Sequence, residues 1–287
     1  ETDIEALVVD DASSDGTCVE IERLAASDPR VRLLRNPVNM GFSHTINNGM
    51  KAARGQWVAC LDADDWYAPD RLERMVAAAE TAGSRFVADN VYLIDEGKEE
   101  PWGTIFKARS STPRSLSIDE FIEKDMPGRH GTMAVLQPIF RADFISEHEI
   151  FYDETVRGGA DSYFMIRCLA KEPCLLLPEA MYYYLQLPSS ISHQRTVKRL
   201  KELQEKNHEL CAWAQPWAEK STLDLLAARV RVSGMYIRYY HAVEPAKRGE
   251  WGAALGALAR DPGMLPTVIV GLWRNLVARV RQWAVRR

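Results

Sequence analysis

The chain has 287 residues, which is enough for one large domain with an appendage or for two small domains. Hydrophobic residues make up 46% and charged residues 26%, as in ordinary globular proteins, and the formal net charge of −4 argues against a general nucleic-acid binder. The five cysteines are widely spaced without a Cys-x-x-Cys motif, so we expect no disulfide framework or zinc site, and a reducing cytoplasm fits best.

The first part of the chain alternates segments typical of strands with segments typical of helices. Short apolar runs predict strands, and apolar residues at helical spacing predict helices. We expect strands at Ala6–Val9, Val31–Leu34, Trp57–Leu61 and Arg85–Ile94, and helices at Val19–Ala26, Ser43–Ala53 and Arg71–Glu80. This alternation predicts an α/β fold with a mainly parallel sheet flanked by helices.

Three carboxylates, Asp62, Asp64 and Asp65, follow the third predicted strand. Clustered like charges repel one another unless a cation lies among them, and oxygen ligands favour Mg²⁺ or Mn²⁺. Such a metal can hold a diphosphate and take up negative charge as that diphosphate leaves. Asp10 and Asp11 end the first predicted strand, and because ligands bind beyond the carboxyl ends of such strands, the two groups can share one crevice. An acidic turn without a function is the alternative.

The middle of the chain is less regular, and the end is predicted to be helical. Ser117 and Glu120 are spaced as a capping box at the start of a short helix that ends at Lys124. Further strands are expected at Met133–Phe140, Leu175–Leu177 and Met181–Leu185, and further helices at Ser162–Lys171, Thr196–Trp213, Thr222–His241 and Glu250–Ala259.

The C-terminal segment Leu265–Arg287 has five arginines and no acidic residue. Trp273, Leu276, Val277 and Val280 follow helical spacing, and the arginines populate other faces. This pattern favours a helix that lies in a membrane interface with its arginines toward anionic lipid. An ordinary helix packed on its own domain is the alternative.

The N-terminal sequence resembles the family 2 glycosyltransferases, which have the GT-A fold. The matching text is Val8-Val9-Asp10-Asp11-Ala12-Ser13-Ser14-Asp15-Gly16-Thr17, Arg35-Asn36, Asn39-Met40-Gly41-Phe42-Ser43, Asn47, Ala53-Arg54-Gly55 and Leu61-Asp62-Ala63-Asp64-Asp65. The later half matches less closely, through Gly158-Gly159-Ala160-Asp161 and Ser190-Ile191-Ser192, and the middle is similar to bacterial exopolysaccharide enzymes of the succinoglycan type.

The resemblance implies a reaction in which a nucleotide-diphosphate sugar, most often UDP-linked, gives its sugar to an acceptor hydroxyl with inversion. It implies that Asp11 accepts a hydrogen bond from the uracil ring with support from Asp10, that Asp62 contacts the ribose, and that Asp64 binds Mg²⁺ or Mn²⁺. It places Asp161 as the general base, a role that typically contributes ~10²–10⁴-fold to the rate. The expected acceptor is a glycan or a lipid-linked oligosaccharide, and the basic C-terminal segment predicts a cytoplasmic enzyme that lies peripherally at the inner face of the cell membrane.

The sequence departs from the family pattern at several positions. Ala160 replaces one member of the usual acidic pair, and Ile46 stands where the family often has an arginine. Leu187 replaces a common histidine, with His193 just beyond it. The sequence begins at Glu1, inside the second strand region, so the resemblance predicts that the family's first strand is missing from it.

Together these observations predict a GT-A glycosyltransferase domain over residues 1–194 and an α-helical region over residues 195–287. The predicted function is inverting, metal-dependent glycosyl transfer in exopolysaccharide or cell-surface glycan synthesis. Two alternatives stay open. One is a sugar-phosphate nucleotidyltransferase, and the other is a catalytically inactive nucleotide-sugar-binding or membrane-associated scaffold protein.

Overall fold

The computed structural model describes residues 3–108, 110–127, 133–156, 158–187 and 196–261, together with residues 263, 265, 266, 268, 269 and 273. These residues form two compact units, each assembled from several segments of the chain. The first unit comprises residues 1–90, 108–116 and 136–182, and the second comprises residues 91–107, 117–135 and 183–287. The domain boundary after residue 194 stays a prediction.

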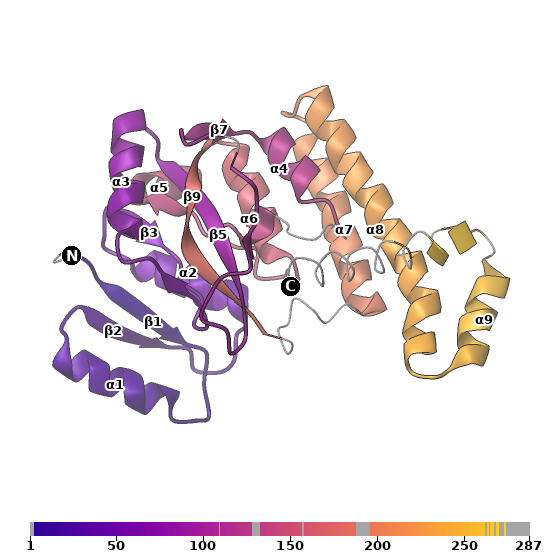
Figure 1. Ribbon diagram of the computed structural model, residues 1–287, viewed down its shortest axis with the longest axis horizontal. Helices are drawn as coiled ribbons and strands as arrows, with labels where there is room; N and C mark the ends of the chain where they lie inside the picture. Colours follow the sequence, from indigo (N-terminus) through magenta and orange to yellow (C-terminus); the bar gives the residue numbers. More distant parts are fainter. Residues whose placement is uncertain are drawn as a thin grey trace. The chain divides into compact units, whose positions relative to one another are not determined.

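The first unit begins with a two-stranded parallel pair. Strand β1 (Ala6–Asp10) pairs with β2 (Val31–Arg35) in the register Ala6 to Val31. Helix α1 (Thr17–Ser27) connects the two strands and packs against β2, and Figure 1 shows it alongside the pair. Helix α2 (Phe42–Ala52) follows β2 and packs on β1. The predicted alternation of strand and helix is therefore confirmed in this part of the chain.

A larger sheet follows, with the strand order β3-β8-β5-β9-β4 and two short strands, β6 and β7, on β5 and β9. Its strands are β3 (Trp57–Ala59), β4 (Trp66–Tyr67), β5 (Phe86–Asp95), β6 (Gly103–Thr104), β7 (Arg114–Leu116), β8 (Ile139–Arg141) and β9 (Cys174–Gln186). Strand β8 is antiparallel to both β3 and β5, so those two run in the same direction while the sheet as a whole is mixed. The α/β class is confirmed, with antiparallel pairings added to the expected parallel ones.

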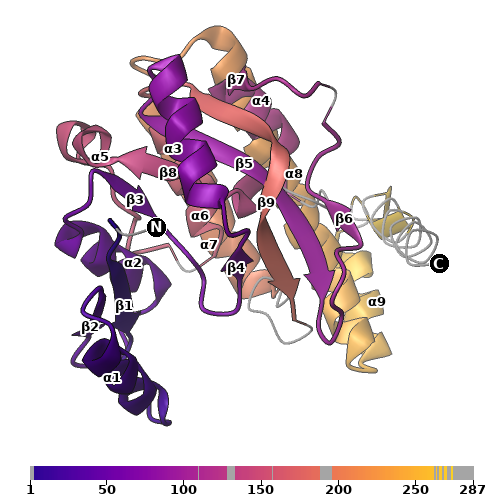
Figure 2. The ribbon, with the colours of Figure 1, turned by 60° about the vertical axis from the view of Figure 1, so that its left-hand side comes forward.

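Helices cover the larger sheet. Met75 and Ala79 of helix α3 (Arg71–Ala82) pack against Val87 of β5, Ile139 of β8 and Met181 of β9. Figure 2 shows α3 lying across this face of the sheet. Helices α5 (Ala142–His148) and α6 (Ala160–Leu169) complete the helices of the first unit.

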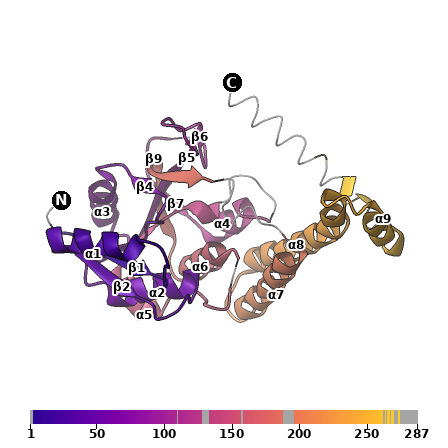
Figure 3. The same ribbon diagram turned by 90° about the horizontal axis from the view of Figure 1, so that it is seen from below.

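The second unit is mainly helical. It contains α4 (Ile118–Lys124), the short 3₁₀ helix η1 (Met133–Val135), α7 (Val197–Ala214), α8 (Lys220–Lys247) and α9 (Trp251–Arg260). Helix α8 packs on α4, α7 and α9, and Figure 3 shows α7 and α8 side by side. The predicted cap of α4 is confirmed, because Oγ of Ser117 accepts a hydrogen bond from the backbone N–H of Glu120 at 3.2 Å. Across the described ranges, no helix combines the length and apolar character that a bilayer span requires.

Candidate functional site

The acidic turn follows β3, as the sequence predicts, and it is followed by the short strand β4, which was not predicted. The backbone N–H of Asp65 donates to the carbonyl of Asp62 at 3.1 Å, which closes the turn. The hydroxyl of Tyr182 on β9 donates to Oδ2 of Asp65 at 2.7 Å and accepts the N–H of Asp62 at 3.3 Å. Nε2 of Gln137 donates to Oδ2 of Asp62 at 3.3 Å, and Asp64 is exposed. Tyr182 and Gln137 therefore hold the turn from two other parts of the first unit.

The charge of Asp161 acts on the same turn. Burial raises the pKa of Asp62 from its usual 3.8 to about 6, and the negative charges of Asp161 and Asp64 raise it further in the same direction. Asp161 is distant from Asp62 in sequence, yet it lies close enough to oppose the ionisation of Asp62. The structure therefore joins the predicted base to the predicted acidic turn.

Asp161 lies at the N-terminus of helix α6. Gly159 has φ of 72° at the N-cap of α6, a left-handed conformation that glycine adopts without steric cost. Asp161 lies in the first turn, where the positive end of the helix dipole favours a carboxylate. The hydroxyl of Tyr152 donates to Oδ1 of Asp161 at 3.3 Å.

Asp11 lies at the end of β1 and binds the start of α2. Its Oδ1 accepts from Nδ2 of Asn36 at 2.8 Å and from the N–H of Met40 at 2.7 Å, and its Oδ2 accepts from the N–H of Gly41 at 2.8 Å. Burial opposes ionisation of Asp11, but the hydrogen bonds together outweigh it and hold the pKa of that carboxyl below its usual value.

Asp10 is buried, and both of its oxygens accept the backbone N–H of Ser13, at 3.3 and 3.2 Å. This arrangement suits the supporting role that the sequence assigns to it. That Asp10 and Asp11 share one crevice with the acidic turn stays a prediction.

A buried ion pair lies behind the turn. Nη2 of Arg71 contacts Oδ1 of Asp89 at 2.8 Å and also donates to the carbonyl of Gln137. Cζ of Arg71 lies 4.3 Å from the ring centroid of Tyr67 and 5.2 Å from that of Tyr182. Arg71 thus stabilises both residues that hold the acidic turn, Gln137 and Tyr182.

Sequence reasoning missed these supporting residues. Tyr182 was assigned to a strand and Arg71 to a helix, and neither Gln137 nor Tyr152 was singled out. The one signal available was the charged or polar character of Arg71, Asp89 and Gln137 inside segments predicted to be helix or strand.

The carboxylates of the acidic turn suit a divalent metal that is bound together with a diphosphate. Among the described residues, no group of three or more His, Cys, Asp or Glu side chains could hold a metal ion. The donors on the acidic turn are all carboxylate oxygens, and Mg²⁺ in phosphate-binding sites is commonly held by one or two carboxylates together with substrate phosphates. The residues present therefore fit a metal that arrives with a diphosphate.

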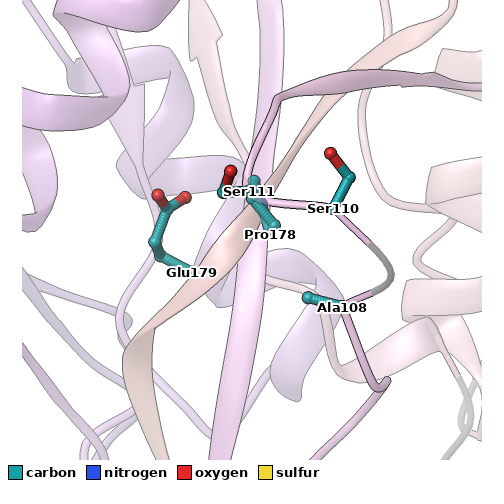
Figure 4. A pocket seen from close by; sticks show the side chains of 5 residues that line it. All are labelled: Ala108, Ser110, Ser111, Pro178 and Glu179. Atoms are coloured by element: carbon teal, nitrogen blue, oxygen red, sulfur yellow. The ribbon is translucent and has the colours of Figure 1, made fainter.

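An open pocket lies elsewhere in the first unit, beside β9. It is lined by Ala108, Ser110, Ser111, Pro178 and Glu179 (Figure 4), and none of these is a predicted site residue. Glu179 faces solvent, and its Oε1 lies 3.4 Å from Nη2 of Arg74.

His193 and most of the basic segment Leu265–Arg287 lie outside the described residues.

Comparisons with known proteins show the family to which the chain belongs. The profile of "Glycosyl transferase family 2" matches residues 1–142. The succinoglycan biosynthesis protein ExoO of Rhizobium meliloti is 31% identical over 99% of this chain and 79% of its own length. The succinoglycan biosynthesis protein ExoU of the same organism is 25% identical over 96% of this chain and 81% of its own length.

Solved structures give the fold. Residues 1–349 of S. aureus TarS superpose with a TM-score of 0.63 at 17% identity, covering 98% of this chain and 83% of that one. The same protein in complex with UDP-GlcNAc gives a TM-score of 0.57 at 14% identity, covering 91% and 84%. The fold is GT-A. With the ordered motif residues in place and a relative that matches almost the whole sequence, the chain belongs to glycosyltransferase family 2.

Proposed function

We propose that the protein transfers a sugar from a UDP-sugar to an acceptor hydroxyl with inversion, in exopolysaccharide or cell-surface glycan synthesis. The observation that carries the proposal is that Asp161 lies near enough to Asp62 for its charge to raise the pKa of Asp62, because a base and a donor-binding carboxylate must both lie near the point of sugar transfer. The names of ExoO and ExoU support the pathway, and the TarS complex with UDP-GlcNAc supports the donor class.

Each carboxylate has a separate part in this mechanism. Asp11 accepts the N–H of the uracil ring, with Asp10 behind it, and Asp62 contacts the ribose. Asp161 removes the proton from the acceptor hydroxyl as that oxygen attacks the anomeric carbon from the side opposite the diphosphate. Attack from that side inverts the anomeric configuration.

Mg²⁺ or Mn²⁺ would be held by Asp64 together with the diphosphate oxygens of the donor. When bound, such an ion neutralises the charge that develops on the departing UDP. Asp64 is exposed and therefore open to a ligand, while Asp65 is buried and bonded to Tyr182. This difference supports Asp64 as the metal ligand and a structural part for Asp65.

Titration calorimetry with UDP tests the metal assignment. The wild type is expected to bind UDP more tightly with Mn²⁺ than with EDTA, and Asp64→Ala is expected to abolish that difference. Asp70→Ala, which removes an exposed carboxylate at the start of α3, is the matched control. Metal-dependent UDP affinity that is unchanged in Asp64→Ala contradicts the assignment.

We further propose that the acceptor is a glycan or a lipid-linked oligosaccharide and that the enzyme works peripherally at the inner face of the cell membrane. Leu265, Ile269 and Trp273 are spaced four residues apart and are 51%, 58% and 65% exposed, and the sequence continues with five arginines. Exposed apolar residues on one helical face beside cationic residues suit an anionic lipid surface.

Vesicle co-sedimentation tests the membrane contact. Binding to vesicles that contain phosphatidylglycerol is expected to fall with added salt, and to fall further in the double variant Ile269→Ser and Trp273→Ser. Trp217→Ser, which removes an exposed tryptophan from the turn after α7, is the control. Equal sedimentation of the double variant and the wild type contradicts the proposal.

A further inference from the structure

Tyr152 connects the predicted base to the rest of the first unit. Its hydroxyl donates to Oδ1 of Asp161 at 3.3 Å. Its ring stacks on Phe164 of α6, with centroids 4.1 Å apart and planes at 7°, and meets Phe42 of α2 edge-on at 5.7 Å. Aromatic rings in these two arrangements attract each other beyond simple burial. The ring is therefore held on two sides.

The backbone of Tyr152 is fixed as well. Its N–H donates to Oδ1 of Asn47 at 2.8 Å, and its carbonyl accepts from Nδ2 of Asn47 at 2.9 Å. Asn47 is only 2% exposed, and its Nδ2 also donates to Oε1 of Glu154 at 2.9 Å. A side-chain amide that binds both the N–H and the carbonyl of one residue leaves that residue little freedom to shift.

The same helix that holds Tyr152 also binds Asp11. The N–H groups of Met40 and Gly41, the two residues that lead into α2, donate to the carboxylate of Asp11. Phe42 and Asn47 follow in α2 and contact Tyr152. Helix α2 thus connects the residue expected to bind the nucleotide base with the residue that contacts Asp161.

The hydroxyl of Tyr152 is suited to donate and not to ionise. Burial raises the pKa of Tyr152 well above its ordinary value, and the charge of Asp161 raises it further. A phenylalanine would fill the same aromatic space, so packing alone does not require the hydroxyl. The hydroxyl is the group that distinguishes tyrosine here, and its partner is Asp161.

We propose that Tyr152 is a positioning residue that orients the carboxylate of Asp161 toward the acceptor hydroxyl, and that α2 holds Tyr152 in register with the nucleotide site at Asp11. The inference rests on the proposed role of Asp161 as general base. Orientation of a reacting group by fixed neighbours contributes to rate because small misplacements are costly. Because Tyr152 acts through Asp161, loss of its hydroxyl should lower turnover and leave the affinity for the donor unchanged.

A double-mutant cycle tests the proposal. UDP release from UDP-glucose, UDP-galactose and UDP-GlcNAc is measured with Mn²⁺ for the wild type, Tyr152→Phe, Asp161→Asn and the double variant, with enzyme in excess for the slow variants. Tyr152→Phe is expected to lower kcat roughly tenfold, the scale of one hydrogen bond to a charged group, with KM for the donor unchanged. In the Asp161→Asn background the same substitution is expected to have no further effect.

Controls separate positioning from folding. Thermal unfolding and UDP affinity of Tyr152→Phe should match those of the wild type. Tyr239→Phe, which removes the hydroxyl of another buried tyrosine on α8, should leave kcat unchanged.

Three outcomes overturn the proposal while leaving the proposed function standing. They are an unchanged or increased kcat in Tyr152→Phe, a change in KM alone, and an equal loss of kcat in both backgrounds. A wild type that releases UDP from none of the three donors contradicts the proposed function itself, and the role of Tyr152 falls with it.

Discussion

The hydroxyl of Tyr182 donates a 2.7 Å hydrogen bond to Oδ2 of Asp65 and so ties strand β9 to the acidic turn. The same oxygen accepts the backbone N–H of Asp62. One phenolic oxygen therefore contacts Asp62, which is expected to contact the ribose, and Asp65, which follows the expected metal ligand Asp64. The position of that turn depends on a residue that is distant in sequence.

Tyr182→Phe is expected to weaken Mn²⁺-dependent UDP binding roughly threefold to tenfold. A hydrogen bond to a charged group contributes about 1.5–3 kcal/mol, and a water molecule that binds Asp65 in place of the lost hydroxyl would recover part of that free energy. Calorimetry checks this, with Tyr183→Phe on the neighbouring position of β9 as the control. Equal UDP affinity of Tyr182→Phe and the wild type would show that the turn holds its shape without this bond.

Arg71→Leu is expected to lower the free energy of unfolding by about 3–5 kcal/mol, because it leaves the buried carboxylate of Asp89 without its partner. The double variant Arg71→Leu and Asp89→Leu should recover part of this loss, since no buried charge then remains. Urea denaturation measures both. Arg74→Leu, which breaks a half-exposed pair with Glu179, should change the free energy by less than about 1 kcal/mol. A similarly small effect in Arg71→Leu would contradict the account.

Asp62 gives a prediction for pH. Because its pKa is raised to about 6, the folded protein binds a proton more tightly than the unfolded chain does between the usual value of 3.8 and about 6. The free energy of unfolding of the metal-free protein should therefore fall as pH rises through this window, and the loss should persist above it. Asp62→Asn removes the ionisable group and is expected to stabilise the metal-free protein at pH 7 by roughly 1–3 kcal/mol.

Urea denaturation in EDTA at several pH values measures this effect. Asp224→Asn, at an exposed position on α8, is the control and should follow the wild type. If Asp62→Asn is less stable than the wild type at pH 7, the fold does not disfavour the ionised form of Asp62, and the prediction is wrong.

Local patterns predicted most of the secondary structure. The cap at Ser117 followed from its spacing to Glu120, and the helix α3 followed from apolar residues at helical spacing. Two predictions were wrong in detail. Residues Leu175–Leu177 and Met181–Leu185 belong to one strand, β9, because Pro178 and Glu179 continue the extended chain between them. In Met133–Phe140, the first residues form a 3₁₀ helix and only Ile139 and Phe140 join strand β8.

The candidate site was predictable to a smaller extent. The carboxylates of the acidic turn and Asp161 could be found because each follows a recognisable strand end or glycine pair. Tyr182 and Gln137 could not, because each acts through a contact with a residue far away in sequence. Tyr152 could not either, because nothing in the sequence between it and Asp161 indicates that the two side chains meet. Tertiary contacts of this kind are set by the packing of the sheet and not by any periodicity of the chain.

The stereochemical course gives a further prediction. Hydrolysis of UDP-α-glucose by an inverting enzyme should release β-glucose first, which ¹H NMR detects before mutarotation equilibrates the anomers. Water takes the place of the acceptor hydroxyl in this reaction, so no acceptor needs to be known. Initial release of α-glucose would contradict the direct displacement in which Asp161 acts as base.

The most direct test of the central claim is the rate of UDP release from a UDP-sugar with Mn²⁺, compared between the wild type and Asp161→Asn, with UDP affinity measured for both. The account predicts that the wild type turns over, and that Asp161→Asn keeps its UDP affinity while its turnover falls by ~10²-fold or more. Near-normal turnover in Asp161→Asn would contradict the account and move the base to another carboxylate, with Asp153 and Glu154 the next candidates.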